Sequence, residues 1–571
     1  MKKLVIVGGV AGGASAAARA RRLDESLEIT VFERGRYISY ANCGLPYHLS
    51  GTIPSRDSLL LMTPELFNQR FRVKIHTAHL VTSLNPDRHT VSVRNLDTGE
   101  EFQEHYDKLI LSPGSSPILP PIPGVDDPDV CVLWTIPDMD AIKGRIKSGR
   151  SAVVVGGGFI GVEVAENLAE AGVKTTLIEM KNTILPHLDD EMTVPLEKAL
   201  VKGGVNLRTS RAVKAFRRDT KGLVAELDTG EELPVDFAVI SAGVKPNGEL
   251  ARGTGIEVTR GGALVVNRRM ETTVKDIYAV GDAVQVTDPV TGNMVSVPLA
   301  GPANRQGRIA AENALGGNSV YKGTYGTSIV KVFHLAAGGT GASEKTLLEN
   351  GIEYRKLYIH PASHASYYPG GACMTIKLLF DPCGKILGMQ AVGEDGVDKR
   401  IDVVAAALGN DLTVEDLQEL ELSYAPPFGS AKDAVNYAGF VAGNILSGLT
   451  SQVYPDELPS DAFLLDVREK EETASGSIPG STLIPLGELR DRLDELPKDR
   501  EIVIYCAVGI RGYAAERILK QRGYQAANLS GGFASWSMFQ QTGQYRNAED
   551  TLREGVSAPA SHFESCRYTG D

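Results

Sequence analysis

Cysteine is scarce in this chain. Six cysteines are spread over 571 residues, and no close pair has the spacing of metal ligands, so no metal site is expected. Thiols this few and this far apart exclude a disulfide-stapled scaffold. They favour a cytoplasmic protein with reduced thiols, one or two of them chemically active. The cysteines are Cys43, Cys131, Cys373, Cys383, Cys506 and Cys566.

Long apolar runs and an excess of basic residues are also missing. The chain has no stretch of about 18 uncharged apolar residues, so we expect no membrane span. Its 59 lysines and arginines are outnumbered by 71 aspartates and glutamates, which gives a net charge of -12. Nucleic acid is therefore not expected as the main partner, because phosphate binding needs a basic face. This balance still permits a local basic pocket for a small anion.

The length and an internal near-repeat indicate several domains. A chain of 571 residues exceeds what one hydrophobic core supports. Residues 3–34 and 151–180 each show a strand, a glycine turn, a helix and a second strand that ends in glutamate, which predicts two dinucleotide-binding domains. We expect the first domain to be interrupted, because strand-like segments at 108–111 and 276–282 lie on either side of the second repeat.

The second repeat carries a complete nucleotide-binding motif. Gly156, Gly158 and Gly161 satisfy the pattern G-x-G-x-x-G between a strand and a helix. Glycines there let the backbone approach a pyrophosphate, whose charge the helix N-terminus stabilises. Glu179 ends the next strand and can accept hydrogen bonds from a ribose diol, which favours NADH over NADPH. The alternative is a tight packing turn between strand and helix.

The first repeat is less regular. The turn runs from Gly8 to Gly13 and has Val10 where the middle glycine is expected, but Glu33 stands correctly at the strand end. Lys2, Lys3 and the apolar residues after them also resemble a secretory signal. We favour the nucleotide turn, because cleavage of a signal would destroy it.

Cys43 is the strongest candidate for a redox centre. It has no partner at C-x4-C spacing, so the site cannot store electrons as an internal disulfide. Such a thiol would form a mixed disulfide with substrate, a persulfide or a sulfenic acid. Residues 44–49 are predicted to open a helix, whose positive end would lower the thiol pKa. The alternative is a buried structural cysteine.

Three segments carry a resemblance to a known family. They are 39–47 (SYANCGLPY), 106–114 (YDKLILSPG) and 273–282 (TVKDIYAVGD). With the two glycine turns, they make residues 1–445 resemble the pyridine nucleotide–disulfide oxidoreductases, most of all the coenzyme A disulfide reductase branch. The resemblance implies a homodimeric enzyme that uses FAD, NADH and coenzyme A.

The resemblance also implies which residues hold the two nucleotides. Asp282 would bind the ribityl chain of FAD. The predicted FAD residues are Gly8, Gly12, Gly13, Glu33, Arg34, Gly114, Asp282 and Ala300. The predicted NADH residues are Gly156, Gly158, Gly161 and Glu179.

Substrate residues follow from the same resemblance. Arg19 and Arg22 share one helix face and suit the charged nucleotide end of coenzyme A, unless they form only a solvated basic face. Tyr367 and Tyr424 match tyrosines near the reactive cysteine, with Tyr424 coming from the other subunit; otherwise they are interface aromatics. The predicted coenzyme A residues are Ser15, Arg19, Arg22, Ser39, Asn42 and Lys432.

The C-terminal part contains a second candidate thiol. Cys506 follows a strand and precedes a helix, in a loop expected to turn backbone N–H groups toward the sulfur. Four residues separate Cys506 from Arg511, one fewer than in phosphatase loops, which favours sulfur over phosphate. With 464–468 (LLDVR) and 476–480 (GSIPG), the segment resembles a rhodanese domain, although Ser477 stands where many rhodaneses have histidine.

We therefore predict an α/β protein with two Rossmann-like dinucleotide-binding domains, an α+β dimerisation domain and a C-terminal rhodanese-like α/β domain. The expected boundaries are 1–112 with 250–324 for FAD, 113–249 for NADH, 325–446 for dimerisation, 447–460 for a linker, 461–545 for the rhodanese-like domain and 546–571 for a tail.

The fusion favours one function. A reductase of persulfides or polysulfides has use for a sulfur-carrying loop, whereas a reductase of coenzyme A disulfide alone does not. We expect electrons to pass from NADH through FAD to a sulfur–sulfur bond at Cys43, releasing hydrogen sulfide and thiol. The alternatives are coenzyme A disulfide reduction proper, NADH oxidase or peroxidase, a sulfurtransferase with a regulatory flavin half, and a redox sensor. Peroxide chemistry ranks lower because Ala11 stands where related peroxidases carry histidine.

Overall fold

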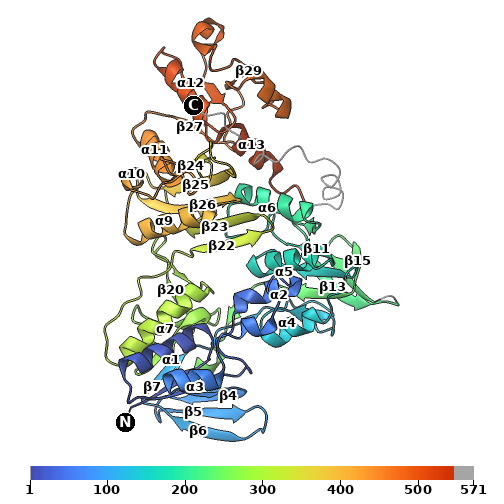
Figure 1. Ribbon diagram of the computed structural model, residues 1–571, viewed down its shortest axis with the longest axis vertical. Coiled ribbons are helices and arrows are strands. Elements are labelled where there is room, and N and C mark those ends of the chain that lie inside the picture. Colours follow the sequence, from blue (N-terminus) through green and yellow to red (C-terminus); the bar gives the residue numbers. More distant parts are fainter. Residues whose placement is uncertain (1, 221, 546–571) are drawn as a thin grey trace. The chain divides into compact units, whose positions relative to one another are not determined.

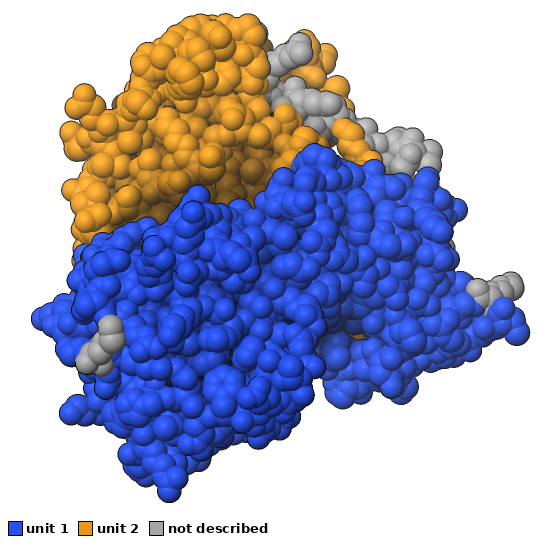
Figure 2. All heavy atoms as spheres, turned by 60° about the horizontal axis from the view of Figure 1, so that its bottom comes forward, with its two compact units in different colours: residues 1–175, 213–324 blue, residues 176–212, 325–571 orange. Residues whose placement is uncertain are grey.

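The computed structural model describes residues 2–220 and 222–545. The predicted tail, 546–571, lies outside these residues. The chain divides into two compact units (Figure 2): unit 1 is Met1–Thr175 with Val213–Thr324, and unit 2 is Thr176–Ala212 with Tyr325–Asp571. Among the described helices, none is long and apolar enough to cross a membrane.

Unit 1 begins with a five-stranded parallel sheet. Its interior strands are almost completely buried and apolar, as expected when helices cover both faces of a parallel sheet. Strands from before and after the second repeat pair in this sheet, which confirms that the first domain is interrupted. In spatial order the strands are β19 (Ile277–Ala279), β7 (Lys108–Leu111), β1 (Lys3–Val7), β2 (Glu28–Phe32) and β3 (Lys74–His76).

Two helices of this domain lie side by side (Figure 1): α1 (Ala11–Leu23) and α7 (Ala300–Ala314). A Cβ atom at Gly307 would lie 2.2 Å from the carbonyl oxygen of Gly12. Only a glycine therefore allows this approach, and it brings the first nucleotide turn against α7.

Further elements of unit 1 include those around the second glycine turn and a small antiparallel sheet. Helix α2 packs against α5. The parallel strands are β10 (Ser151–Val155), β16 (Phe237–Ile240) and β9 (Val130–Val132), with helices α2 (Leu45–Ser50), α4 (Ile136–Lys143) and α5 (Phe159–Glu170). The antiparallel strands are β4 (His79–Asn85), β5 (Thr90–Asn95) and β6 (Glu101–His105).

Unit 2 contains a five-stranded antiparallel sheet and a five-stranded parallel one. The antiparallel strands are β22 (Ser328–Val332), β23 (Leu335–Gly341), β26 (Ile386–Gly393), β25 (Met374–Phe380) and β24 (Arg355–Ile359), with helices α9 (Val397–Gly409), α10 (Val414–Glu419) and α11 (Ala434–Leu446). The parallel strands are β27 (Gln452–Val453), β31 (Ala526–Leu529), β30 (Ile502–Tyr505), β28 (Phe463–Asp466) and β29 (Thr482–Leu483), with helices α12 (Ile510–Lys520) and α13 (Gly532–Gln541).

The segment predicted as a linker, 447–460, is part of the fold. Strand β27 pairs in parallel with β31 of the last sheet, and the Ser451 N–H donates to the Glu516 carboxylate at 2.6 Å. The Tyr454 hydroxyl donates to the Lys356 carbonyl on β24 at 2.7 Å. Its polar composition suggested a loose connection, but its backbone polar groups are used in the sheet.

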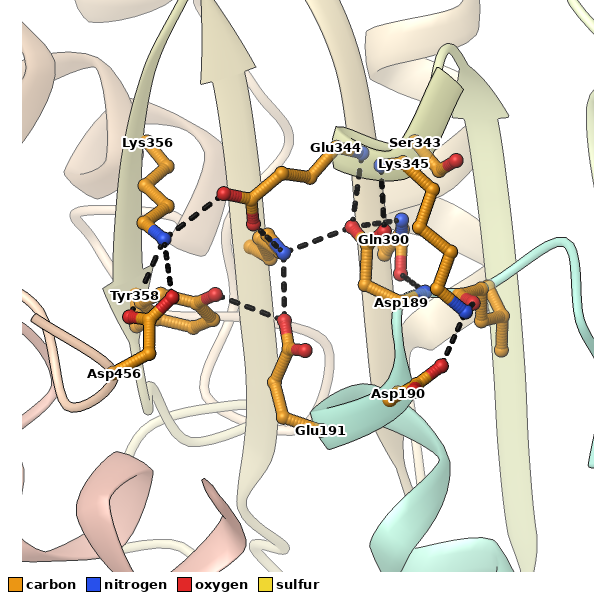
Figure 3. Close-up of polar contacts among 12 residues, drawn as sticks. Asp189, Asp190, Glu191, Ser343, Glu344, Lys345, Lys356, Tyr358, Gln390 and Asp456 are labelled. Carbon is orange, nitrogen blue, oxygen red and sulfur yellow. Dashed lines mark hydrogen bonds and ion pairs between the residues drawn. The ribbon is translucent and has the colours of Figure 1, made fainter. Parts of the chain in front are cut away.

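A buried charge cluster joins three segments of unit 2 (Figure 3). The Lys377 ammonium on β25 is fully buried and lies 2.8 Å from Asp189, 2.6 Å from Glu191 and 2.5 Å from Glu344. Asp189 and Glu191 belong to the start of α6 (Asp190–Lys202). Because these bonds tie α6 to the antiparallel sheet, residues 176–212 group with unit 2, and the boundary between units passes through the predicted NADH domain.

Inside the cluster, Lys377 and Lys356 determine the direction in which the pKa of Glu344 is shifted. Burial alone would raise the pKa of Glu344, but Lys377 and Lys356 outweigh it and lower that pKa to about 2. The carboxyl is therefore ionised throughout the neutral range. Lys356 extends the cluster to Asp456, at 3.2 Å, in the segment that leads to the last sheet.

We predict that Lys377→Met destabilises unit 2 by about 3–5 kcal/mol, because three buried carboxylates lose their shared cation. Thermal and urea unfolding of the full chain, followed by circular dichroism, measure the change. Lys345→Met is the matched control: this lysine pairs with Asp190 but is 38% exposed, so its removal costs at most about 1 kcal/mol. Equal loss of stability in both variants would contradict this account of the cluster.

Candidate functional site

The first glycine turn has the backbone geometry of a dinucleotide-binding turn. Gly8 has φ +98°, and a Cβ there would lie 2.0 Å from the Ser112 carbonyl oxygen at the end of β7. A Cβ at Gly13 would lie 1.9 Å from the carbonyl oxygen of Gly8. Both positions therefore require glycine, the first for its conformation and the second for space.

The second turn repeats these relations. Gly156 has φ +107° and would place a Cβ 2.3 Å from the Ser241 carbonyl oxygen; a Cβ at Gly161 would lie 1.8 Å from the carbonyl oxygen of Gly156. The middle glycine is different, because a Cβ at Gly158 meets no atom of the described residues within 4 Å. Its side-chain space is open, as close approach of a pyrophosphate to the backbone requires.

Carboxylates end the second strand of each repeat, as predicted. The Glu33 carboxylate accepts N–H bonds from Gly9 and Gly35, each at 2.7 Å, which fixes its orientation. Each oxygen keeps a lone pair that a ribose hydroxyl can use. Arg34 beside it is exposed. In unit 2, Glu179 follows β11 (Lys174–Ile178), is buried, and accepts from the Lys181 N–H at 2.6 Å.

The predicted FAD residues lie at the carboxyl ends of neighbouring parallel strands. Asp282 follows β19 and accepts a hydrogen bond from the Ser115 hydroxyl at 2.7 Å; its burial raises its pKa. Gly114 follows β7 with φ +69°. Ala300 is the first residue of α7, whose fifteen residues direct free N–H groups out of that end. Ligands of open α/β sheets bind at this edge, so the residues present fit an FAD.

Cys43 lies in a single 3-10 turn, Asn42–Gly44, directly before α2, and its side chain is exposed. Partial desolvation, followed by the Glu163 charge, raises its pKa above the ordinary value. The prediction of a lowered pKa is therefore wrong. The physical reason is that α2 has only six residues, too few for its dipole to offset these two effects.

Glu163 is a site residue that the sequence reading missed. It lies on α5, and its carboxylate accepts a hydrogen bond from the Tyr47 hydroxyl at 3.0 Å. Burial, followed by the Glu166 charge, raises its pKa to about 7 against the effect of this bond. The only sequence signal was a carboxylate two residues after Gly161. Glu163 thus changes charge near neutral pH, and its charge acts on the Cys43 thiol.

The predicted coenzyme A residues on α1 have partners within unit 1. Arg19 pairs with Glu312 of α7 at 2.5 Å, and the Ser15 hydroxyl donates to Asn304 at 2.5 Å. Arg22 lies over the Phe71 ring, 5.3 Å from its centroid. The basic charge expected on this face is therefore partly balanced by a carboxylate.

The other predicted substrate residues are in two places. Ser39 has φ +45°, and its N–H donates to the Gly9 carbonyl at 3.0 Å, while Asn42 begins the turn of Cys43. Both therefore stand in unit 1 near the first glycine turn. Lys432 is exposed in unit 2, just before the N-cap of α11.

Tyr367 and Tyr424 come together within one chain. Their hydroxyl oxygens are 2.8 Å apart, and their side chains are 73% and 47% exposed. If Tyr424 contacts Cys43 of another subunit, Tyr367 of the same chain must lie there too, because the two hydroxyl groups are hydrogen-bonded to each other.

The Cys506 loop lies between β30 and α12, and one backbone N–H bonds to its sulfur. Cys506 is buried directly after β30, and its sulfur accepts the Gly509 N–H at 3.2 Å. The loop rests on the start of α13, where the Phe533 N–H donates to the Cys506 carbonyl at 2.8 Å. Arg511 makes two parallel hydrogen bonds to Glu472, at 2.7 and 2.6 Å. Glu472 is a second residue that the sequence reading missed.

We predict that Gly158→Ala raises the KM for NADH about tenfold or more without lowering the Tm, because the added methyl group meets only the ligand. Steady-state kinetics and thermal unfolding measure the two effects. In the matched variant Gly161→Ala, the new Cβ meets the Gly156 carbonyl, so the Tm falls. An unchanged KM in Gly158→Ala would remove this turn from the NADH site.

We predict that Glu163→Gln lowers the pKa of Cys43, because the carboxylate charge that raises it is lost. The pH dependence of Cys43 alkylation by iodoacetamide, followed by peptide mass spectrometry, gives this pKa. Glu170→Gln is the control, since that carboxylate lies at the exposed end of α5. The same Cys43 pKa in both variants would exclude Glu163 as a cause.

Comparison with known families agrees with this geometry. Residues 2–307 match the pyridine nucleotide-disulphide oxidoreductase family, residues 327–435 match the dimerisation domain of the same family, and residues 454–539 match the rhodanese-like domain. These matches confirm the predicted fold class. They also confirm the enzyme class, an FAD- and pyridine-nucleotide-dependent disulfide or persulfide oxidoreductase with a rhodanese-like domain.

Individual relatives are similar over most of the chain. Coenzyme A disulfide reductases of Staphylococcus aureus are 36% identical over 446 residues, which are 77% of this chain and 100% of theirs. The structure of reduced Bacillus anthracis CoADR-RHD has 45% identity and a TM-score of 0.92 over 94% of this chain and 98% of that one. A NAD-dependent persulfide reductase from A. fulgidus has 37% identity and a TM-score of 0.89 over 94% and 100%. The chain therefore belongs to the pyridine nucleotide-disulphide oxidoreductase family and carries a rhodanese-like domain at its C-terminal side.

Proposed function

We propose that the chain is a persulfide reductase that passes electrons from NADH through FAD to a sulfur–sulfur bond at Cys43. One observation carries the proposal: a solitary cysteine within the part that matches the pyridine nucleotide-disulphide oxidoreductase family, and a cysteine loop of rhodanese type, occur in the same polypeptide. The first cysteine can pass electrons to an incoming sulfur through a covalent bond, and the second can carry that sulfur.

The reaction balances in sulfur, protons and electrons. A persulfide R–S–SH, NADH and one proton give the thiol R–SH, hydrogen sulfide and NAD⁺. When bound, FAD accepts the hydride and supplies the electron pair. The Cys43 thiolate attacks the outer sulfur of R–S–SH, the S–S bond of the substrate breaks and R–SH leaves, so that Cys43 carries a persulfide. The electron pair then splits the S–S bond of this persulfide, which restores the Cys43 thiolate and releases hydrogen sulfide. Glu163, with its pKa of about 7, can take up or give a proton beside the thiol during this exchange.

Several residues have positioning roles in this proposal. The first glycine turn and Glu33 hold FAD, while the turn of Gly158 binds NADH. Asp282 and the start of α7 complete the flavin site. Of these, Glu33 and Asp282 are already held by hydrogen bonds within unit 1, so little side-chain ordering is needed when the ligand binds.

The substrate that we propose is coenzyme A persulfide or a related thiol persulfide. Relatives in S. aureus bear the name coenzyme A disulfide reductase, and the A. fulgidus structure is described as a persulfide reductase. The S. aureus match covers 77% of this chain, whereas the two structural matches cover 94%. The rhodanese-like domain at residues 454–539 supports persulfide over disulfide, because a sulfur-carrying domain has a use only with sulfane sulfur.

We propose that the enzyme acts as a homodimer in the cytoplasm. Tyr367, Tyr424 and Phe428 are exposed aromatic side chains on the domain that matches the family's dimerisation domain, and Phe428 is 72% exposed. Burial of such side chains favours association. A cytoplasmic location suits a reactive thiol, since thiols are kept reduced there.

Coenzyme A disulfide reductase proper is the second candidate function. It is favoured by the 36% identity to the S. aureus relatives and uses the same Cys43. It gives no role to Cys506, which is why we place it second.

The test is NADH oxidation by the full chain with coenzyme A persulfide, coenzyme A disulfide, polysulfide, peroxide and oxygen. We expect the persulfide to give the highest kcat/KM. Cys43→Ser should lose about three orders of magnitude or more of this activity, because the covalent step is lost. Cys506→Ser should keep reduction of free persulfide.

Cys131→Ser, a half-buried cysteine of unit 1, is the matched control and should behave as the parent. Persulfide reduction that survives Cys43→Ser would overturn the mechanism. Faster turnover with coenzyme A disulfide than with persulfide would favour the second candidate.

A further inference from the structure

We infer that Glu472 determines which sulfur donors the Cys506 loop accepts: thiol-borne sulfane sulfur is taken, and the thiosulfate dianion is rejected. This inference deepens the proposed function at its second cysteine and rests on Cys506 being a sulfur carrier. Glu472 acts as a specificity residue, because it cancels the charge of the one cationic side chain in the loop.

The Arg511–Glu472 pair is a two-point ion pair. Both terminal nitrogens of Arg511 donate to the Glu472 carboxylate, at 2.7 and 2.6 Å, in the fork geometry that gives the strongest such bonds. The side chains are only 23% and 32% exposed. Burial would raise the pKa of Glu472, but Arg511 outweighs it and the pKa is lowered, so the carboxylate is ionised at neutral pH.

The position of Glu472 is fixed by a second, more deeply buried pair. Arg468 bonds to the Asp466 carboxylate at 2.7 Å and is about 2% exposed. Arg468 also donates to the Glu472 carbonyl at 3.4 Å and to the Gly476 carbonyl at 2.8 Å. The 3-10 segment that carries Glu472, Lys470–Ser475, is thereby tied to the end of β28. Glu472 is a built part of the site rather than a mobile surface carboxylate.

The rest of the loop brings no formal charge to the sulfur. Between Cys506 and Arg511 the residues are alanine, valine, glycine and isoleucine. The sulfur itself accepts one backbone N–H, from Gly509 at 3.2 Å. One N–H bond suits the single charge of a thiolate or a cysteine persulfide. This one N–H bond does not stabilise a second negative charge on the sulfur donor.

Donor charge therefore decides which molecule can react. Thiosulfate would have to lose the hydration of two negative charges beside an arginine that is already neutralised, and loss of hydration at an uncompensated charge costs several kcal/mol. A thiol persulfide brings at most one charge at its reacting end. The chemistry of the loop thus matches the persulfide that we propose for Cys43.

The transfer step balances without an oxidant or a reductant. The Cys506 thiolate attacks the outer sulfur of R–S–SH, a bond forms between Sγ and that sulfur, and the S–S bond of the donor breaks. The leaving thiolate takes the proton and departs as R–SH. Cys506 then carries one extra sulfur as a persulfide, at the same oxidation level as in the donor.

The experiment measures sulfur loading of Cys506 in the full chain with Cys43→Ser in the background, so that reduction at Cys43 plays no part. The donors are coenzyme A persulfide and sodium thiosulfate, and the readout is the mass gain of one sulfur on the Cys506 peptide. We expect the background protein to load from persulfide at least about a hundredfold faster than from thiosulfate.

The variant Glu472→Gln should raise the thiosulfate rate about tenfold or more, because Arg511 regains its net charge, while the persulfide rate changes by less than about threefold. Glu471→Gln is the matched control: it removes the same charge from the neighbouring, exposed residue and should leave both rates unchanged. Glu472→Asp keeps the charge and should retain the preference for persulfide.

Equal loading from the two donors by the background protein would overturn the inference, even if the Glu472 variants failed to fold. The inference would also be overturned if Glu471→Gln and Glu472→Gln changed the thiosulfate rate by the same factor. No loading from either donor would instead remove Cys506 as a sulfur carrier. NADH oxidation is not measured here, so none of these results bears on the chemistry of Cys43.

Discussion

One buried ammonium group is the constraint on which unit 2 depends. Lys377 balances carboxylates from α6 and from the start of α8 (Glu344–Glu349), and Lys356 carries the cluster on to Asp456. The antiparallel sheet that carries these lysines also supports the Cys506 loop. The Tyr358 N–H on β24 donates to Ser530 at 3.1 Å, and the next residues along the chain are the turn on which Cys506 rests. The loop is therefore positioned from outside its own domain.

The nucleotide turns could be predicted from the sequence because their requirement is a steric one. A carbonyl oxygen occupies the place of the Cβ at Gly8, Gly13, Gly156 and Gly161, so only one residue type is allowed and the pattern is visible. Strands β1, β2 and β10 could be predicted for a similar reason, since strands buried on both faces of a parallel sheet are continuous apolar runs in the sequence. Val10 is tolerated because it stands before α1 with negative φ and needs no glycine conformation.

The carboxylates Glu163 and Glu472 could not be predicted in the same way. Glu163 lies 116 residues after Tyr47, and Glu472 lies 39 residues before Arg511. Contacts of this kind depend on how helices pack, which a local pattern does not encode. The linker prediction was wrong for a related reason, because polar residues with no hydrophobic period can still supply an edge strand such as β27. Whether such a segment forms a strand depends on the strand with which it pairs, and not on the β-propensity of its own residues.

Cys43 and Cys506 differ in exposure but have an electrostatic feature in common. Cys43 is exposed and has an acidic neighbour; Cys506 is buried, and the arginine in its loop is already paired. Among the described residues, the charges that act on Cys43 are acidic, and the one cation of the Cys506 loop is neutralised by Glu472, although cations are the usual means of attracting anionic substrates. An enzyme of this kind selects sulfur donors by how little charge they carry into the site. Persulfides and disulfides, whose S–S bonds are neutral, meet that condition at both cysteines, and the shared condition explains why one chain can combine the two chemistries.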